Sequence, residues 1–257
     1  MTSAARLDFR ERDTEVRELM DDPDCDLDTL HRTYERFTLI NSVLSDARGL
    51  YRREVLPRAR NAAAPVRVLD IGAGGADVAR ELLARAQRDR VPLEVVAIDP
   101  DPRAAWWALR QPPTPGLTVR RAHSSELVNE LTSGDLTNDD QRFDLVISNH
   151  VLHHLDGHAL GVLLADSERL VRRGGRVIHA DLVRSRLSYA AFAAVTLPLQ
   201  PTVLRGSFIR PDGLASIRRS FLPRELAAVV PPGWSVTRVS PWRQHVEYSP
   251  PNRGSDV

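Results

Sequence analysis

The chain has 257 residues, which is enough for one α/β core with additions or for two small domains. Hydrophobic residues make up 42% of it and charged residues 27%, both ordinary for a globular protein, and the formal net charge is +1. This charge argues against a nucleic-acid or anionic-membrane partner, and the single cysteine excludes an internal disulfide. We expect a cytoplasmic protein without a secretory signal or a membrane span.

Residues 1–60 are predicted to form a helical N-terminal cap. Apolar side chains recur there at steps of three and four residues, which places them on one helical face: Leu27, Leu30, Tyr34, Phe37 and Ile40. Such a face either packs on the core or forms a lid over a substrate pocket. We expect core packing with some contact to the pocket.

From residue 66 the sequence alternates between short apolar segments and longer amphipathic ones. The predicted strands cover 66–72, 93–101, 117–123, a segment that starts at 143, and 174–182. The predicted helices cover 77–89, 102–111, 124–135 and 159–171, and the fourth strand runs into the last of them. This alternation is typical of a parallel sheet with helices on both faces.

The alternation stops at residues 183–220, an apolar segment punctuated by prolines, which we expect to form a lid insertion. The chain resumes with a predicted helix at 223–230 and two short strands, at 234–242 and 243–249. The core domain is therefore predicted at residues 61–250, after the cap and around the insertion.

The first predicted strand ends in a glycine-rich turn, "DIGAGGAD", at residues 70–77. Glycines allow a tight turn and a close approach of the backbone to a ligand. A dinucleotide fold would place a third glycine where Asp77 stands, and that carboxylate would repel a pyrophosphate. Asp70 adds a second negative charge, so the turn suits a cationic ligand without phosphate.

The second predicted strand ends at Asp99, in "VVAIDPD". A carboxylate at this place accepts hydrogen bonds from both hydroxyls of a ribose. The alternative is an N-cap of the helix that follows. The two roles are compatible.

Four segments together carry a family resemblance: "VLDIGAGGAD", "VVAIDPD", "FDLVISNHVLHHL" and "LVRRGGRVIHADL". They resemble the ordered motifs of the class I S-adenosylmethionine-dependent methyltransferases over residues 66–182. The resemblance implies an α/β fold with a doubly wound, Rossmann-like, mostly parallel seven-stranded sheet of order 3-2-1-4-5-7-6 and the helical cap. The implied cofactor is S-adenosyl-L-methionine, with S-adenosyl-L-homocysteine as product. Ala76 replaces the usual third glycine, and we expect only modest consequences.

The resemblance also implies which residues bind the cofactor, at the carboxyl ends of strands one to four. They are Asp70, Gly72, Ala73, Gly74, Asp99, Pro100, His123, Ser124, Asn149 and His150. His123 stands where many relatives have an acid that holds the adenine amino group. Either His123 lies near the base, or the backbone of Ser124 and its neighbours contact it; the alternative is a surface loop.

The segment "NHVLHHLDGH" holds four histidines, which on a helix would form one face: His150, His153, His154 and His158. Metal binding is one interpretation of such a cluster, but it lacks a cysteine and an HExxH pattern, so we expect no metal. The paired histidine resembles that of small-molecule methyltransferases. This implies that His153 is the general base, next to His154, and that Asp181 supports it.

We expect the acceptor to be a small, aromatic or polyketide-like molecule, because the insertion has apolar residues that could line its pocket: Tyr189, Phe192, Leu197 and Leu199. O-methylation is favoured, with C-methylation as the alternative. The segment "YERFTLINSVLS" partly resembles quinone-biosynthesis C-methyltransferases through Tyr34, Asn41 and Ser45, which supports a pocket-capping helix rather than a quinone substrate. Alternatives from other classes are a non-catalytic S-adenosylmethionine-binding module and a nicotinamide-dependent oxidoreductase. We expect a monomer or homodimer that does not bind nucleic acid.

Overall fold

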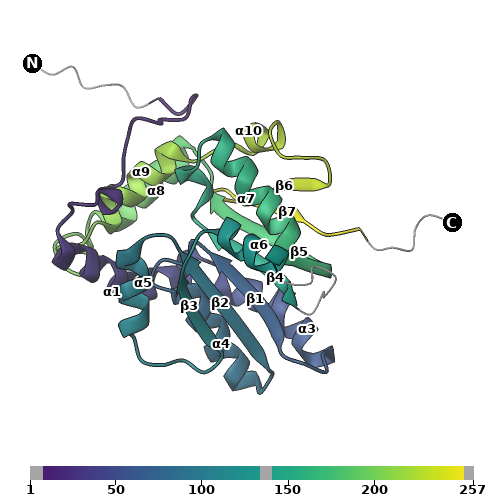
Figure 1. Ribbon diagram of the computed structural model, residues 1–257. Coiled ribbons are helices and arrows are strands. Elements are labelled where there is room, and N and C mark those ends of the chain that lie inside the picture. Colours follow the sequence, from purple (N-terminus) through teal and green to yellow (C-terminus); the bar gives the residue numbers. More distant parts are fainter. Residues whose placement is uncertain (1–7, 134–140, 252–257) are drawn as a thin grey trace, which may run out of the picture.

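The structure, a computed structural model, describes residues 8–133 and 141–251, with the side chains of residues 38–44 left aside. The first seven residues of the predicted cap, the end of the helix predicted at 124–135 and the side chain of Asn41 lie outside the described part. Figure 1 shows a central sheet between two layers of helices.

The sheet has seven strands in the order β3-β2-β1-β4-β5-β7-β6. Their bounds are β1 Val66–Ile71, β2 Leu93–Asp99, β3 Leu117–Arg121, β4 Phe143–Asn149, β5 Val171–Leu182, β6 Trp234–Ser240 and β7 Arg243–Tyr248. The first five strands pair in parallel, and β7 pairs antiparallel with both β5 and β6. This confirms the predicted fold class and strand order.

The central strands are apolar because both of their faces are covered. In β1, Val68 and Leu69 point to opposite faces and are fully buried, and in β4 Leu145 and Val146 do the same. All five parallel strands run in the same direction, so β1, β2, β4 and β5 end at one edge of the sheet. The residues that follow these ends form the candidate site.

One layer of helices consists of α1 Leu27–Leu44, α2 Ala47–Leu50, the π-helix η2 Tyr51–Val55, α3 Leu56–Asn61, α4 Asp77–Asp89 and α5 Pro102–Arg110. The other layer consists of α6 Ser124–Ser133, α7 Gly157–Leu170 and α10 Pro223–Ala227. Each layer forms its own apolar cluster with one face of the sheet. Among the described residues, none of these helices has the length and apolar character that a membrane crossing requires.

The predicted apolar face of the N-terminal cap is confirmed in part. Leu30 and Tyr34 are buried and pack with Phe37, Trp107 and other side chains, but Leu27, at the first turn of α1, is 51% exposed. The prediction was wrong for Leu27 because the apolar contact of α1 starts one turn later.

Residues 183–220 contain two helices, α8 Arg186–Thr196 and α9 Ile209–Arg219. Figure 1 shows them beside the N-terminal segment, at the edge of the sheet where the parallel strands end. The short helix η1 Leu19–Asp21 contacts α9, which also contacts the turn η4 Leu152–His154 after β4. The roles of cap and lid, and the boundary at residue 60, stay predictions.

A buried arginine fastens the N-terminal segment to the end of the insertion. The side chain of Arg184 is fully buried and pairs with the Glu225 carboxylate at 2.5 Å. The same guanidinium donates to three backbone carbonyls, those of Phe9, Arg10 and Ser220. One side chain therefore connects segments that are far apart in the sequence.

We expect Arg184→Met to lower the free energy of unfolding by about 3 kcal/mol, because losing one partner of a buried ion pair leaves the other polar groups uncompensated. Chemical denaturation measures this change. The exposed Arg186 supplies the control, since Arg186→Met should change the free energy of unfolding by less than about 0.5 kcal/mol. An equal effect of both substitutions would contradict the role of Arg184.

Candidate functional site

The glycine turn after β1 is held against the end of β2. The backbone N–H groups of Gly72 and Ala73 both donate to the Ile98 carbonyl, at 2.8 and 3.0 Å. Gly72 has a φ of 68°, and a Cβ there would lie 2.5 Å from Val151 Cγ2. Only glycine fits this position. At Gly74 a Cβ would meet nothing within 4 Å, so the turn is open on that side.

Ala76, which replaces a third glycine, has a φ of 62° and lies just before α4. An L-residue in this left-handed conformation costs about 1–2 kcal/mol. The methyl group is fully buried in the apolar cluster, which returns about 0.8 kcal/mol. Burial thus offsets part of the conformational cost of an alanine at this position and leaves about 1 kcal/mol or less.

Asp99, at the end of β2, ties the strand to the glycine turn. Its carboxylate accepts hydrogen bonds from Gly74 N at 2.8 Å and from Asp101 N at 2.9 Å. The N-cap of α5 is Asp101, which accepts from Arg103 N at 2.7 Å. The N-cap role considered for Asp99 was therefore wrong, and the remaining lone pairs of its carboxylate are available to a ligand.

Asp70 presents a buried carboxylate with an unused acceptor. The residue is 2% exposed, and its Oδ2 has no hydrogen-bond partner among the described residues. Burial, together with the nearby carboxylates of Asp99 and Asp77, raises the pKa of Asp70 to about 7. An ammonium or sulfonium group would compensate both the burial and the repulsion. The cradle formed by Gly72, Gly74, Asp99 and Asp70 thus fits a cationic nucleoside.

The other residues predicted to bind the cofactor differ in what their polar atoms contact. Ser124 Oγ donates to Asp166 at 2.7 Å, and Asn149 Oδ1 accepts from Arg243 at 2.5 Å. His123 is exposed, and its backbone N–H is capped by a carboxylate of the following helix. Pro100 is exposed beside the carboxylate of Asp99.

The four histidines do not form one helical face, which corrects the sequence prediction. His150 has a φ of 61° and lies outside any helix, where its backbone N–H donates to the Ala180 carbonyl. Asp156 caps α7, so that helix begins only at residue 157. His153 and His154 therefore lie in the separate turn η4, while His158 is exposed on α7.

The predicted pair of His153 and Asp181 is in contact and buried. His153 Nδ1 lies 2.7 Å from Asp181 Oδ1, and the backbone N–H of His153 donates to Asp181 Oδ2 at 2.8 Å. Each residue is 1% exposed. Since Asp181 lies near the end of β5 and His153 follows β4, adjacent strands hold the ring in a fixed orientation.

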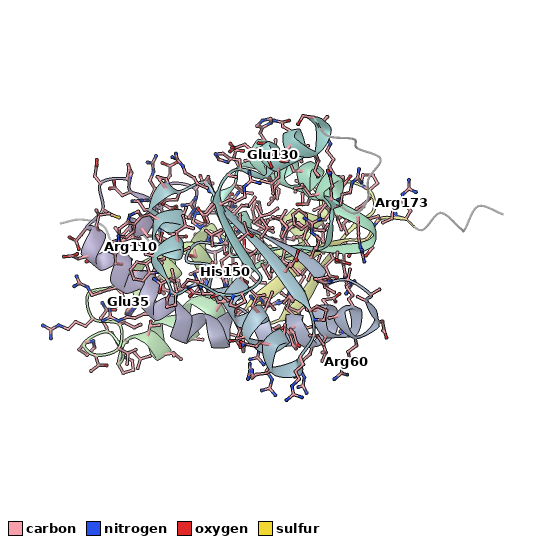
Figure 2. All side chains as sticks on the ribbon, turned by 60° about the horizontal axis from the view of Figure 1, so that its bottom comes forward. Glu35, Arg60, Arg110, Glu130, His150 and Arg173 are labelled. Atoms are coloured by element: carbon pink, nitrogen blue, oxygen red, sulfur yellow. The ribbon has the colours of Figure 1, made fainter. Side chains whose placement is uncertain are left out.

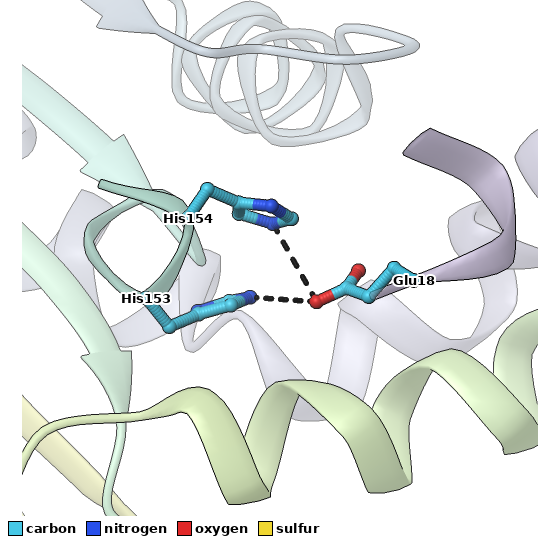
Figure 3. Close-up of side chains that lie close together, drawn as sticks. All are labelled: Glu18, His153 and His154. Atoms are coloured by element: carbon cyan, nitrogen blue, oxygen red, sulfur yellow. Dashed lines mark ion pairs between the residues drawn. The ribbon is translucent and has the colours of Figure 1, made fainter. Parts of the chain in front are cut away.

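A third group, Glu18, was missed by the sequence analysis. Its Oε1 lies 3.2 Å from His153 Nε2 and 3.7 Å from His154 Nε2 (Figure 3). Glu18 is 5% exposed and accepts a hydrogen bond from Ser216 Oγ at 2.8 Å. The N-terminal segment carries no motif that would mark this residue, and its contact to η4 is made only by tertiary folding.

Two carboxylates on one imidazole stabilise its charged form. Burial alone would lower the pKa of His153, but the carboxylates of Asp181 and Glu18 raise this pKa to about 10. An imidazolium has no lone pair to accept a proton. The general-base role expected of His153 therefore requires Glu18 to move away from Nε2.

The glycine cradle and the histidine turn lie next to each other. Val151, which precedes η4, is the residue that a side chain at position 72 would strike. His154 also acts electrostatically on the carboxylate of Asp99. Figure 2 shows His150 near the middle of the molecule, away from the labelled residues of its periphery. A ligand in the cradle would thus have η4 as a neighbour.

The apolar residues expected to line an acceptor pocket have different surroundings in the structure. Tyr189 stacks edge-on against Phe9, and Phe192 occupies the space above Gly213. Leu197 is 61% exposed. Their role toward an acceptor stays a prediction.

A family model described as a methyltransferase domain matches residues 43–221. The search of curated proteins found no match. Among solved structures, human N-acetylserotonin methyltransferase with bound S-adenosylmethionine is 12% identical, with a TM-score of 0.53; the match covers 88% of this chain and 57% of that one. The plantazolicin methyltransferase BpumL, with a triazolic analogue and S-adenosylhomocysteine, is 10% identical, with a TM-score of 0.52. That match covers 89% of this chain and 92% of BpumL. A TehB-like S-adenosylmethionine-dependent methyltransferase from Corynebacterium glutamicum is 13% identical, with a TM-score of 0.52. That match covers 87% of this chain and 97% of the TehB-like protein.

These findings agree with the enzyme class and the cofactor that the motifs implied, while the cofactor contacts of individual residues stay predictions. The chain belongs to the methyltransferase-domain family and has the fold of the class I S-adenosylmethionine-dependent methyltransferases.

Proposed function

We propose that this chain transfers a methyl group from S-adenosylmethionine to an oxygen atom of a small, aromatic or polyketide-like molecule. The observation that carries the proposal is the buried pair of His153 and Asp181. His153 lies on the turn η4, and Val151, just before this turn, contacts the glycine cradle at Gly72. Methyl transfer requires the acceptor atom to lie in line behind the methyl carbon. A rigid polar pair beside the donor meets this requirement.

The cradle supports the donor side of the proposal. Gly72 and Gly74 let the backbone approach the donor, and Asp99 accepts hydrogen bonds from the ribose hydroxyls. Asp70 is assigned to the cationic amino acid portion, because its Oδ2 is buried and without a hydrogen-bond partner. Asn149 and His150, after β4, lie on the same edge of the sheet.

In the reaction, the acceptor oxygen attacks the methyl carbon, the carbon–sulfur bond breaks, and sulfur keeps the electron pair. The proton of the acceptor hydroxyl must leave the oxygen. His153, oriented by Asp181, is the residue proposed to stand at that oxygen, with His154 beside it. Carbon as the acceptor atom is the alternative, since an electron-rich ring needs less help from a base.

The two classes of alternative differ in what they require of the site. A nicotinamide-dependent oxidoreductase would need a pyrophosphate site where Asp70 and Asp77 stand, and the family match argues against it. A non-catalytic donor-binding module would need the cradle but not the pair of His153 and Asp181. Substitutions of His153 and Asp181 therefore distinguish a non-catalytic module from an enzyme that uses the pair.

We expect the purified chain to methylate members of a panel of phenols, hydroxyquinones, sugars and polyketides when it is incubated with labelled S-adenosylmethionine. Mass spectrometry locates the added methyl group and distinguishes oxygen from carbon. Transfer only to protein or nucleic acid would contradict a small-molecule acceptor.

We expect Asp181→Asn and His153→Ala to lower the rate of methyl transfer by about 10²–10⁴-fold and to leave the dissociation constant of S-adenosylmethionine nearly unchanged. His158→Ala is the control, because His158 is exposed on α7. Isothermal titration gives donor binding, and thermal unfolding checks that each variant is folded. Full transfer activity in both variants would contradict a role of the pair in methyl transfer.

We expect the dissociation constant of S-adenosylmethionine to rise several-fold as the pH falls from 7.5 to 5.5. The pKa of Asp70 is about 7 in the free chain, so below pH 7 binding a cationic donor must first remove a proton from this carboxyl group. The amino group of the donor stays charged in this range. The nearby Asp99, whose pKa is also raised by burial, acts in the same direction.

Asp70→Asn should weaken binding at pH 7.5 and remove most of the pH dependence, whereas Asp28→Asn, on the exposed side of α1, should preserve both. The pH dependence of folding stability has the opposite sign to that of donor binding. A carboxyl group whose pKa is raised on folding stabilises the folded chain at low pH, and that stabilisation is lost as the pH rises from about 4 to 7. A donor affinity that does not change between pH 5.5 and 7.5 would contradict the assignment of Asp70.

A further inference from the structure

We propose that Glu18, His153 and His154 form a binding site for a divalent transition metal ion, next to the donor cradle. One ligand atom of each residue lies within 4.8 Å of the other two (Figure 3). The sequence analysis expected no metal because the histidine segment lacks a cysteine and an HExxH pattern. The structure adds the carboxylate that completes a set of two histidines and one acid.

The distances fit such a site. Glu18 Oε1 lies 3.2 Å from His153 Nε2 and 3.7 Å from His154 Nε2. Metal–ligand bonds of about 2.0–2.2 Å in a tetrahedral or octahedral arrangement place neighbouring ligand atoms about 2.8–3.6 Å apart. Small side-chain movements would therefore bring all three atoms to bonding distance of one ion.

Each proposed ligand also has the supporting partner that metal sites use. His153 Nδ1 lies 2.7 Å from Asp181 Oδ1, and His154 Nδ1 lies 3.1 Å from Asp21 Oδ2. A carboxylate at Nδ1 fixes the proton there and leaves the lone pair of Nε2 for the metal. Both histidines thus turn the same ring nitrogen toward Glu18.

An unsatisfied atom points into the cluster. His153 is 1% exposed, and its Nε2 is buried without a well-aligned hydrogen bond, although Glu18 is at ion-pair distance. Buried polar atoms normally have a hydrogen-bond partner or a bound ion, so we expect this nitrogen to have one as well. A metal ion bound by Nε2 and Oε1 would satisfy this nitrogen, while Oε1 also accepts a hydrogen bond from Ser216 Oγ.

The arginines next to the cluster do not fill this place. Arg12 donates to the carbonyls of His153, Leu155 and Arg219, and it stacks on the ring of Phe221. Arg219 lies 3.6 Å from Asp21 and donates to the His154 carbonyl at 3.5 Å. Both guanidinium groups therefore bind the surrounding backbone and Asp21, and neither forms a hydrogen bond or an ion pair with Glu18 among the described residues.

The ligand set selects the class of ion and of substrate. Two imidazoles and one carboxylate suit Fe²⁺, Mn²⁺, Co²⁺ or Zn²⁺ and leave one to three coordination positions open. His154 is partly exposed, so the open positions face its side, toward Asp99 and the cradle. An acceptor with two neighbouring oxygens, as in a catechol or a hydroxyquinone, would chelate the ion there.

This substrate class rests on the proposed methyl transfer. Coordination lowers the pKa of a hydroxyl group, so the acceptor releases its proton to water on binding and attacks as the oxyanion. The oxygen–methyl bond forms, the carbon–sulfur bond breaks, and sulfur keeps the electron pair. His153 then serves as a ligand and does not need to act as a base.

The test uses the full chain after treatment with a chelator, titrated with Co²⁺ as a spectroscopic probe and with Zn²⁺ by calorimetry. We expect one ion per chain, visible absorption bands of coordinated Co²⁺, and displacement of Co²⁺ by Zn²⁺. Glu18→Gln and His154→Ala should each weaken binding by at least about tenfold, and Asp21→Asn by about 10–100-fold, because it orients His154. His158→Ala should bind the ion as the unaltered chain does.

Absence of Co²⁺ uptake by the unaltered chain would overturn the site, as would equal uptake by the folded Glu18→Gln and His154→Ala variants. S-adenosylmethionine binding, measured on the same samples, separates this inference from the proposed function. Donor binding and methyl transfer that persist without any metal uptake would overturn the metal site and leave the proposed function standing. Specific metal uptake without donor binding would do the reverse.

Discussion

The site depends on one buried row of three side chains, Asp181, His153 and Glu18. They come from β5, from η4 and from the N-terminal segment, and each is at most 5% exposed. The contacts along the row are 2.7 and 3.2 Å. Charges removed from water are tolerated only when they compensate each other. The row therefore fixes the N-terminal segment over the strand ends where the donor cradle lies.

The N-terminal segment also forms hydrogen bonds with α9 and η4. The buried carboxylate of Asp212, in α9, accepts hydrogen bonds from the backbone N–H groups of Leu19 and Met20, at 2.7 and 3.0 Å. Arg12 donates to the carbonyls of His153 and Leu155 on the other side. The segment, α9 and η4 are thus connected through hydrogen bonds in addition to the contacts of Glu18. Core packing by Leu30 and site contact by Glu18 are two functions of the same N-terminal region.

Much of the fold could be predicted because it follows from local patterns. The buried strands and the amphipathic helices repeat with fixed periods, and the glycine turn marks where the first strand ends. The contact of His153 with Asp181 was expected from the family resemblance. The fold brings the two residues together because His153 follows β4 and Asp181 lies near the end of the adjacent parallel strand β5.

The remainder of the site could not be predicted, because it depends on tertiary contacts and on single backbone angles. His150 adopts a positive φ and Asp156 delays the start of α7, which separates histidines that a continuous helix would have aligned. Glu18 has no neighbouring motif, and nothing in its own segment indicates that it reaches η4. For the same reason the sequence analysis could not show that a second carboxylate faces the ring of His153.

An imidazole between two buried carboxylates requires a positive charge at its Nε2 side, and the source of that charge decides its chemistry. If the charge is a proton, His153 is an imidazolium and cannot accept another proton from a substrate. If it is a metal ion, the lone pair of Nε2 is used in a bond, and the acceptor is activated by coordination. Only withdrawal of Glu18 leaves a neutral ring that acts as a base. These three states differ in what Glu18 contacts. The position of Glu18 in the N-terminal segment and the protonation state of His153 are therefore coupled.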